Sequence, residues 1–175
     1  MMRIIYYDMD GVAVDFFGGF ALQYGKKHWK EIYDQRKALA DLVGTDFFFR
    51  LQEFDTTRQL IDFARDITNN RPDWDWGINS SPLRGDRDNS AYWKRRWLEK
   101  HGYMPNISNL IFTGQKENYA TNSIDGSSNI LVDDKPTNIM KWNDKGGIGI
   151  LYQANKDSIE KLEAEILWHL EKETT

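Results

Sequence analysis

Short apolar runs, rich in β-branched and aromatic residues, recur along the chain, and polar or turn-forming residues bound each of them. This pattern is typical of strands buried within a sheet. The first run, residues 3–7, is closed by Asp8-Met9-Asp10-Gly11. The runs predict strands at residues 3–7, 74–79, 109–112, 129–132 and 148–152.

Amphipathic stretches of helical period lie between these strands. They predict helices at residues 12–24, 29–42, 56–68 and 89–101, and a last helix that follows Asp157. In the last helix Asp157 and Glu160 have the spacing of an N-capping pair. The apolar residues that share its inward face are Ile159, Leu162, Ile166 and Leu170. Strands that alternate with helices predict an α/β fold, a Rossmann-like parallel sheet with helices on both faces.

The connection between the first two strands is longer than the fold requires. One crossover helix is enough to join two parallel strands, yet three predicted helices intervene. We therefore predict that residues 1–11 and 71–175 form the α/β core. Residues 12–70 would comprise a small helical cap and the connection back to the core. The alternative is that the extra helices decorate the edge of the sheet.

Composition narrows the class of protein. A chain of 175 residues with 40% apolar residues supports one substantial core and a small insertion. The net charge of −4 does not favour binding of long nucleic acid. No cysteine, apolar leader or membrane-length apolar segment is present, so we expect a cytoplasmic protein without a membrane partner. The oligomeric state is left open, with a homodimer as one option.

Polar side chains follow four of the predicted strands. In an open parallel sheet, ligands bind at the carboxyl ends of the strands, so these side chains are expected to converge. They are Asp8 and Asp10 after the first strand, Ser80 and Ser81 after the second, Lys116 after the third, and Asp133 and Asp134 after the fourth.

This set of residue types suits phosphoryl transfer. Clustered carboxylates repel one another, and Mg²⁺, which prefers oxygen ligands, offsets their charge. Asp8 beside the metal could attack phosphorus and form an aspartyl-phosphate. Asp10 could protonate the leaving oxygen and later deprotonate water, while a serine hydroxyl and Lys116 hold the phosphoryl oxygens. The sequence predicts a hydrolase of a small-molecule phosphomonoester.

Four segments resemble, in order, the four motifs of the haloacid dehalogenase (HAD) superfamily. They are residues 8–12 with Asp8 and Asp10, 78–82 with Ser80, 112–116 ending in Lys116, and 131–135 with Asp133 and Asp134. A single motif such as DxDG also occurs in calcium loops and turns, but the ordered set spans residues 3–152, most of the chain. The resemblance implies a HAD-like core with a cap after the first strand.

The closer resemblance is to the 5′(3′)-deoxyribonucleotidase family. Residues 8–16 read DMDGVAVDF, and a basic, Trp-containing helix ending in WLEKHG follows Pro82. Two features depart from that family: Ser80 stands where Thr is usual, and the cap is shorter. The resemblance implies that the substrate is a nucleoside monophosphate, although substrate residues carried on the cap transfer poorly.

The resemblance also implies roles for individual residues. Asp8 would be the nucleophile and a metal ligand, and Asp10 the general acid/base that also gives its backbone carbonyl to the metal. Asp134 would be the third protein ligand, with Asp133 behind it orienting waters or Lys116. The phosphate-binding residues would be Ser80, Ser81 and Lys116, with Lys94 as a further contact, and the base-stacking residues Phe16 and, as a second candidate, Trp29.

Ordinary structural roles remain open for several of these residues. Phe16 and Trp29 also fit a core or an interface, and residues 47–49 fit a core. Lys94 lies among basic residues that mostly form a solvated helix face, so it could also be an ordinary surface lysine.

Two other functions also remain open. The chain could be a HAD phosphatase acting on a sugar phosphate or on a phosphorylated nucleic-acid end. It could also be a catalytically inactive HAD-like binding protein, against which the intact set of Asp8, Asp10, Lys116 and Asp134 argues.

Overall fold

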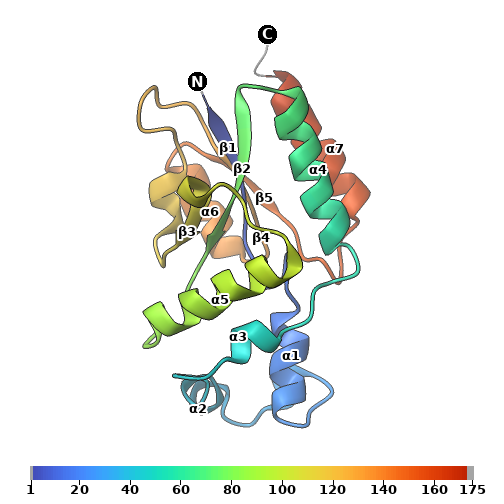
Figure 1. The fold of residues 1–175 in the computed structure, drawn as a ribbon, viewed down its shortest axis with the longest axis vertical. Coiled ribbons are helices and arrows are strands. Elements are labelled where there is room, and N and C mark those ends of the chain that lie inside the picture. Colours follow the sequence, from blue (N-terminus) through green and yellow to red (C-terminus); the bar gives the residue numbers. More distant parts are fainter. Residues whose placement is uncertain (1, 173–175) are drawn as a thin grey trace.

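The computed structural model describes residues 2–172, which are built around a five-stranded, all-parallel sheet (Figure 1). The strand order is β3-β2-β1-β4-β5, so the first strand of the chain occupies the centre of the sheet. The strands are β1 Arg3–Tyr7, β2 Trp74–Ser80, β3 Leu110–Phe112, β4 Ile130–Asp133 and β5 Ile148–Leu151. The predicted α/β fold is confirmed, and Asp8 follows the central strand.

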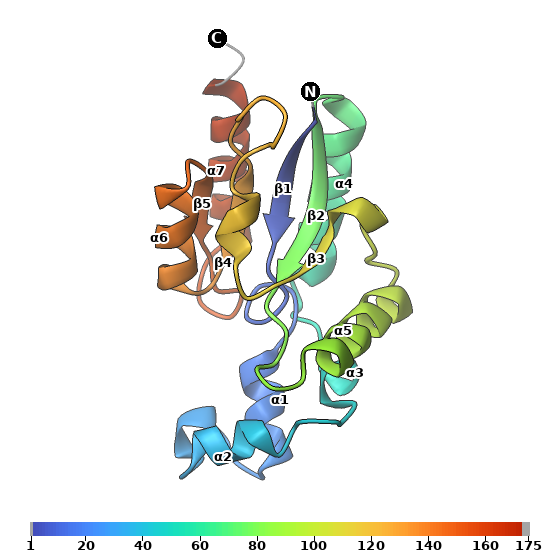
Figure 2. The same cartoon turned by 90° about the vertical axis from the view of Figure 1, so that its left-hand side faces the viewer.

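Helices cover both faces of the sheet (Figures 1 and 2). Helices α4 Thr57–Asn70 and α7 Ile159–Lys172 lie side by side on one face, where Gln59 donates a hydrogen bond to Glu163 at 3.0 Å. Helix α6 Pro136–Asp144 and the 3-10 helix η3 Lys116–Tyr119 cover the other face. Residues 2–172 contain no helix of the length and apolarity needed to cross a membrane.

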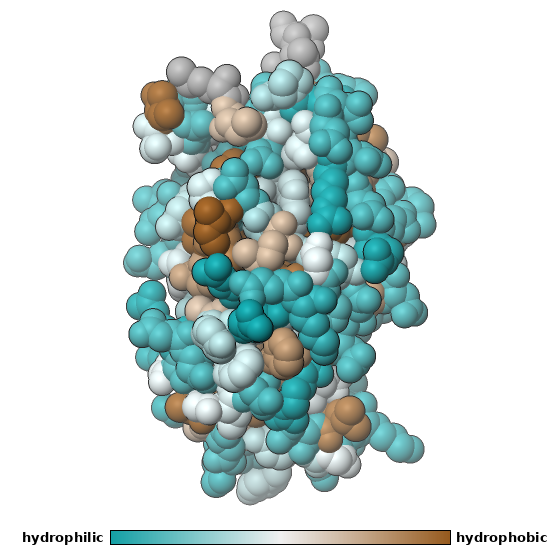
Figure 3. Space-filling view, viewed as in Figure 1, coloured by the Kyte–Doolittle hydropathy of each residue, from teal (hydrophilic) through white to brown (hydrophobic). Residues whose placement is uncertain are grey.

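The sheet is buried on both sides, which explains why its strands appear in the sequence as continuous apolar runs. Ile5, Ile78 and Ile130 are fully buried in the larger core, which extends to α4 and α7. Tyr6 and Trp142 belong to a smaller cluster beneath α6. Apolar side chains on the face seen in Figure 3 are scattered in small groups on a mostly polar surface.

A helical insert follows β1 and lies beyond the carboxyl ends of the strands (Figures 1 and 2). Its elements are α1 Phe16–Gln23, the 3-10 helix η1 Trp29–Glu31, α2 Gln35–Ala40 and α3 Phe47–Arg50. The two ends of the insert meet, since Val14 pairs with Glu53 in a β-bridge and the Asp15 N–H donates to the Gln52 carbonyl at 2.9 Å. This contact forms a stem that fixes where the insert leaves the core.

Helix α5 Arg87–His101 connects the sheet to the insert, and the 3-10 helix η2 Ile107–Asn109 then leads into β3. Helix α5 packs against α3, and the buried Trp97 donates its indole N–H to the Leu51 carbonyl at 2.8 Å. These contacts tie the insert to α5.

Two predicted helices and one predicted helix cap were wrong. The helix predicted at 12–24 starts at Phe16, because the amides of residues 12–14 fold back onto the Met9 carbonyl. The stretch 29–42 is divided into η1 and α2, and Asp34 caps the second piece. The last helix starts at Ile159 with Ser158, not Asp157, accepting the amide of Lys161 at 3.3 Å. Asp157 instead accepts the amide of Gln153.

Candidate active site

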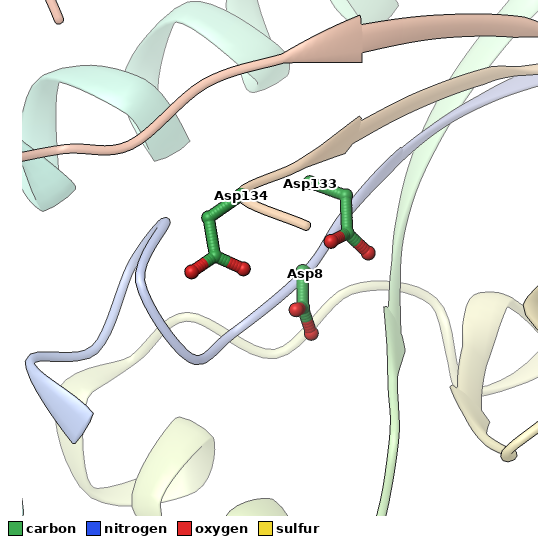
Figure 4. A group of neighbouring side chains, drawn as sticks. All are labelled: Asp8, Asp133 and Asp134. Carbon is green, nitrogen blue, oxygen red and sulfur yellow. The ribbon is translucent and has the colours of Figure 1, made fainter. Parts of the chain in front are cut away.

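The side chains predicted to converge do so at the carboxyl end of the sheet. Asp8 follows β1, Asp133 ends β4, and Asp134 comes directly after it. Oxygen atoms of these three carboxylates lie within 4.8 Å of one another (Figure 4). The parallel strands thus place three negative charges in one small, largely buried volume.

Lys116 lies between two of these carboxylates. Its Nζ is 3.0 Å from Asp8 Oδ1 and 2.6 Å from Asp133 Oδ2, and only 3% of its side chain is exposed. Burial by itself lowers the pKa of Lys116, but the two carboxylates outweigh it and the net pKa is raised. Lys116 therefore carries a full positive charge beside Asp8.

Asp133 is engaged by protein donors on both of its oxygens. In addition to the contact with Lys116, Asp133 Oδ1 accepts a hydrogen bond from the Lys135 amide at 2.8 Å. The Asn138 side-chain amide donates to Oδ2 at 3.0 Å and to Oδ1 at 3.2 Å. Its carboxylate is completely buried. Asp133 thus holds Lys116 and the start of α6 in place, and Asp8 and Asp134 are the members of the cluster that face the open side.

Lys94 reaches the site from α5, although only 1% of its side chain is exposed. Its Nζ donates to Asp10 Oδ2 at 2.7 Å, to Ser80 Oγ at 3.0 Å and to the Ser81 carbonyl at 2.9 Å. The expectation of a solvated basic face was therefore wrong for Lys94. The sequence does indicate that Lys94 is buried, because it lies three and four residues before Trp97 and Leu98 and so shares their buried face of the helix.

Asp10 is held by Lys94 on one oxygen only. Its Oδ1 is buried and accepts no hydrogen bond from any residue that the structure describes. Burial raises the pKa of Asp10, the charge of Asp8 raises it further, and Lys94 opposes both. A carboxyl group with a raised pKa and one uncommitted oxygen is suited to carrying a proton.

Gly11 allows the loop after β1 to pass close to Asp134. Its φ is +81°, in the left-handed region, and a Cβ at this position would overlap the Asp134 carboxylate. Any side chain here would therefore be strained and would also displace Asp134. The glycine of the DxDG motif is required by the geometry of the carboxylate cluster.

The Asp134 carboxyl group has no hydrogen-bonding partner in residues 2–172. Burial raises its pKa to about 7, and Asp8, Asp133 and Asp10 contribute in the same direction. A hard divalent cation would relieve this repulsion, and the donor set, which consists of carboxylate oxygens only, fits such an ion. Asp8 and Asp134 would hold it, and the ligand role expected of the Asp10 backbone carbonyl remains a prediction.

A cavity of about 550 Å³ opens in front of this cluster. Of the predicted site residues, those that line it are Asp8, Asp10, Asp134, Ser81 and Phe16. Ser80 is fully buried and is hydrogen-bonded to Lys94, and Lys116 lies behind Asp8. The phosphate contacts predicted for Ser80, Lys116 and Lys94 remain predictions.

Trp29 lines a neighbouring cavity of about 630 Å³. Phe17, Asp134 and Lys135 line both cavities, so the two adjoin beside the carboxylates. The Phe17 and Trp29 rings meet with their centroids 5.2 Å apart. Sequence reasoning did not single out Phe17, which a helix start at residue 16 turns toward the site.

Phe16 is largely committed to the core of the insert. Its ring stacks on Phe20 and Phe48, with centroid separations of 5.5 and 6.1 Å, and Phe47 contacts it edge-on. Only part of its surface reaches the cavity. Of the two predicted aromatic residues, Trp29 has the more open surroundings.

Comparison with known proteins identifies the fold. No protein-family model and no curated protein matches the chain by sequence. Among solved structures, it is similar to a HAD-superfamily hydrolase, subfamily IA, variant 1, from Geobacter sulfurreducens, with a TM-score of 0.54, 13% identity, and coverage of 86% of this chain and 87% of the other. A hydrolase from Streptococcus pneumoniae matches with a TM-score of 0.52 and 14% identity, over 94% of this chain and 97% of the other.

The HAD domain of the effector protein Lem4 from Legionella pneumophila, an inactive mutant, has a TM-score of 0.51 and 14% identity, over 95% of this chain and 93% of the other. Likeness at this level of identity shows the fold alone: the chain has a HAD-like fold with a helical insert after β1. It does not distinguish the 5′(3′)-deoxyribonucleotidase family from other branches.

Proposed function

We propose that the chain is a Mg²⁺-dependent phosphomonoester hydrolase that forms an aspartyl-phosphate on Asp8, and that its substrates are nucleoside monophosphates. The observation that carries the proposal is the placement of Asp8. It sits at the end of the central strand, paired with Lys116 at 3.0 Å, clustered with Asp134, and open to a cavity. The HAD-like fold supports the same chemistry.

The first step is attack by Asp8 on phosphorus. Asp8 Oδ1 is held by the Met9 amide at 2.8 Å and by Lys116, so Oδ2 is the oxygen left to form the new O–P bond. A bound Mg²⁺ would supply positive charge that keeps Asp8 ionised and offsets charge on the phosphoryl oxygens. Asp10 gives its proton to the leaving oxygen as the ester O–P bond breaks.

The second step regenerates Asp8. Asp10, now ionised and held by Lys94, takes a proton from water as that water attacks phosphorus. The O–P bond to Asp8 breaks, and inorganic phosphate leaves with the water oxygen. Lys94 holds the Asp10 side chain where it lines the cavity, so its carboxyl group is placed to give the proton in the first step and take one in the second.

The aromatic walls of the cavities support the nucleotide substrate. We propose that the base stacks against Trp29 and Phe17, since these rings meet next to the cavity that holds Asp8. The sequence predicted that the base stacks on Phe16; we assign that role instead to the next residue, Phe17, together with Trp29.

Trp29→Ala should raise KM for nucleoside monophosphates by about tenfold, because one base–aromatic stack is worth about 1–3 kcal/mol. Hydrolysis of p-nitrophenyl phosphate should change little. Phe16→Ala is the matched control: it removes a core ring and should lower the melting temperature and affect both substrates alike. Equal losses on both substrates in Trp29→Ala would place the base elsewhere.

A substrate panel tests the function as a whole. Nucleoside monophosphates and sugar phosphates are compared with and without Mg²⁺, with phosphate release as the readout. Preference for a sugar phosphate would reject the nucleotide assignment and leave the hydrolase. Binding of nucleotides without any turnover would favour the inactive binding protein.

Mg²⁺ should stabilise the fold measurably, because it neutralises repulsion among Asp8, Asp134 and Asp10. At a concentration about 100 times its Kd, the gain should approach about 2.7 kcal/mol, seen as a higher melting temperature. Since Asp134 has a pKa raised to about 7, protons compete with the cation below that pH. The gain should therefore be smaller at about pH 6 than at about pH 8. A shift that is equal at both pH values, or absent, would remove the carboxylate cluster as the metal site.

A further inference from the structure

The larger of the two cavities is strongly basic for a chain whose net charge is −4. It lies between the insert, which contributes residues 27–30, and the core segments around Lys135 and Lys156. Lys27, Lys30, Lys135 and Lys156 all line it, against two acidic residues, Asp15 and Asp134. Its charge is therefore opposite in sign to that of the molecule as a whole.

Both acidic residues are engaged elsewhere. Asp15 caps α1 by accepting the Gly18 amide at 2.9 Å, and Asp134 belongs to the carboxylate cluster. None of the four lysines has a carboxylate within ion-pair distance in residues 2–172, whereas Lys37 and Lys94 each have one and Lys116 has two. The basic lining is thus free to meet an anion from outside the protein.

The same cavity offers a flat apolar surface. The Trp29 ring contacts Phe17 at 5.2 Å and stacks on His28 at 5.9 Å, and Lys30 Nζ lies 5.8 Å from its centroid. At about 630 Å³, the cavity is within the usual range of small-molecule sites, about 300–1,000 Å³. A ring and an anionic group could both be accommodated beside the catalytic carboxylates.

We propose that this cavity is a second anion subsite, and that the preferred substrates carry a second phosphate in addition to the one that is hydrolysed. This inference rests on the proposed phosphohydrolase function and narrows its substrate class to nucleoside bisphosphates. The scissile phosphate lies at Asp8, the base lies against Trp29, and the second phosphate meets Lys27, Lys30 and Lys156. Because these lysines come from both the insert and the core, the second phosphate also holds the two together over the substrate.

The test compares thymidine 3′,5′-bisphosphate with the two thymidine monophosphates as substrates of the full chain. The wild-type kcat/KM should be higher for the bisphosphate by about tenfold at low ionic strength, as expected for one well-formed charge-assisted contact. Lys27→Glu and Lys156→Glu should each remove most of this advantage, and added salt should reduce it. Lys26→Glu is the matched control, since Lys26 is an exposed neighbour in the same loop that lines neither cavity.

The outcomes separate this inference from the proposed function. If monophosphates are hydrolysed and the bisphosphate has no advantage, or keeps its advantage in Lys27→Glu and Lys156→Glu, the subsite is rejected and the hydrolase stands. If no phosphomonoester is hydrolysed, the proposed function fails, and calorimetric binding of the bisphosphate decides the subsite. Weaker binding to Lys27→Glu than to Lys26→Glu supports it, and equal binding overturns it.

Discussion

Asp8→Asn should lower kcat/KM by a factor of at least about 10³, a loss of more than about 4 kcal/mol of transition-state stabilisation. The amide keeps the shape of the side chain but is a poor nucleophile and a poor ligand for a hard cation. The variant should also fail to form a phosphorylated protein when mixed rapidly with substrate, which acid quenching and mass measurement would detect in the wild type.

The fold should tolerate this substitution. Asp8 lies in a cluster where carboxylates repel, since its charge raises the pKa of Asp10, Asp133 and Asp134. Loss of one charge relieves that repulsion and offsets the loss of its pairing with Lys116, so the melting temperature should fall little. Asp66→Asn, an exposed change on α4, is the matched control. A tenth of the wild-type rate in Asp8→Asn would reject the covalent mechanism.

The meeting of the site residues could be predicted from the sequence because it depends only on topology. In a parallel sheet every strand ends on the same side of the sheet, and β1 and β4 are neighbours in it, so Asp8 and Asp133 come together although they lie far apart in the chain. Strand type and position followed from continuous apolar runs. The glycine at position 11 is explained in the same way: the short loop after β1 passes so close to Asp134 that there is no room for a Cβ.

The details that were missed depend on helix phase and on tertiary contacts. A helix that starts at Phe16 instead of residue 12 presents a different set of side chains, so Phe17 faces Trp29 while Phe16 enters the core. Lys94 was missed as a buried residue because its partner Asp10 is 84 residues away. The spacing of Lys94 from Trp97 and Leu98 indicates a buried position, but local sequence does not identify Asp10 as the partner that such a buried lysine requires.

Lys94→Met should destabilise the protein strongly. Methionine keeps the length of the side chain but leaves Asp10, Ser80 and the Ser81 carbonyl without their shared donor. Breaking a buried ion pair typically costs about 3–5 kcal/mol, and we expect roughly 3 kcal/mol because about a quarter of the Asp10 side chain is exposed. Urea unfolding would measure the loss, with the exposed Lys100→Met on the same helix as control.

The dependence of this loss on pH distinguishes the ion pair from simple packing. Without Lys94, the pKa of Asp10, already raised by burial, rises further, whereas its pKa in the unfolded chain stays near its ordinary value. The Asp10 carboxyl then ionises less readily in the folded state than in the unfolded chain. The loss of folding stability that comes from Asp10 is therefore absent below about pH 4 and grows as the pH rises through the folded pKa. Adding Asp10→Asn to Lys94→Met should recover part of the loss at about pH 8, because a neutral amide costs less to leave unpaired. A loss that is independent of pH and is not rescued by Asp10→Asn would mean that Lys94 contributes by packing alone.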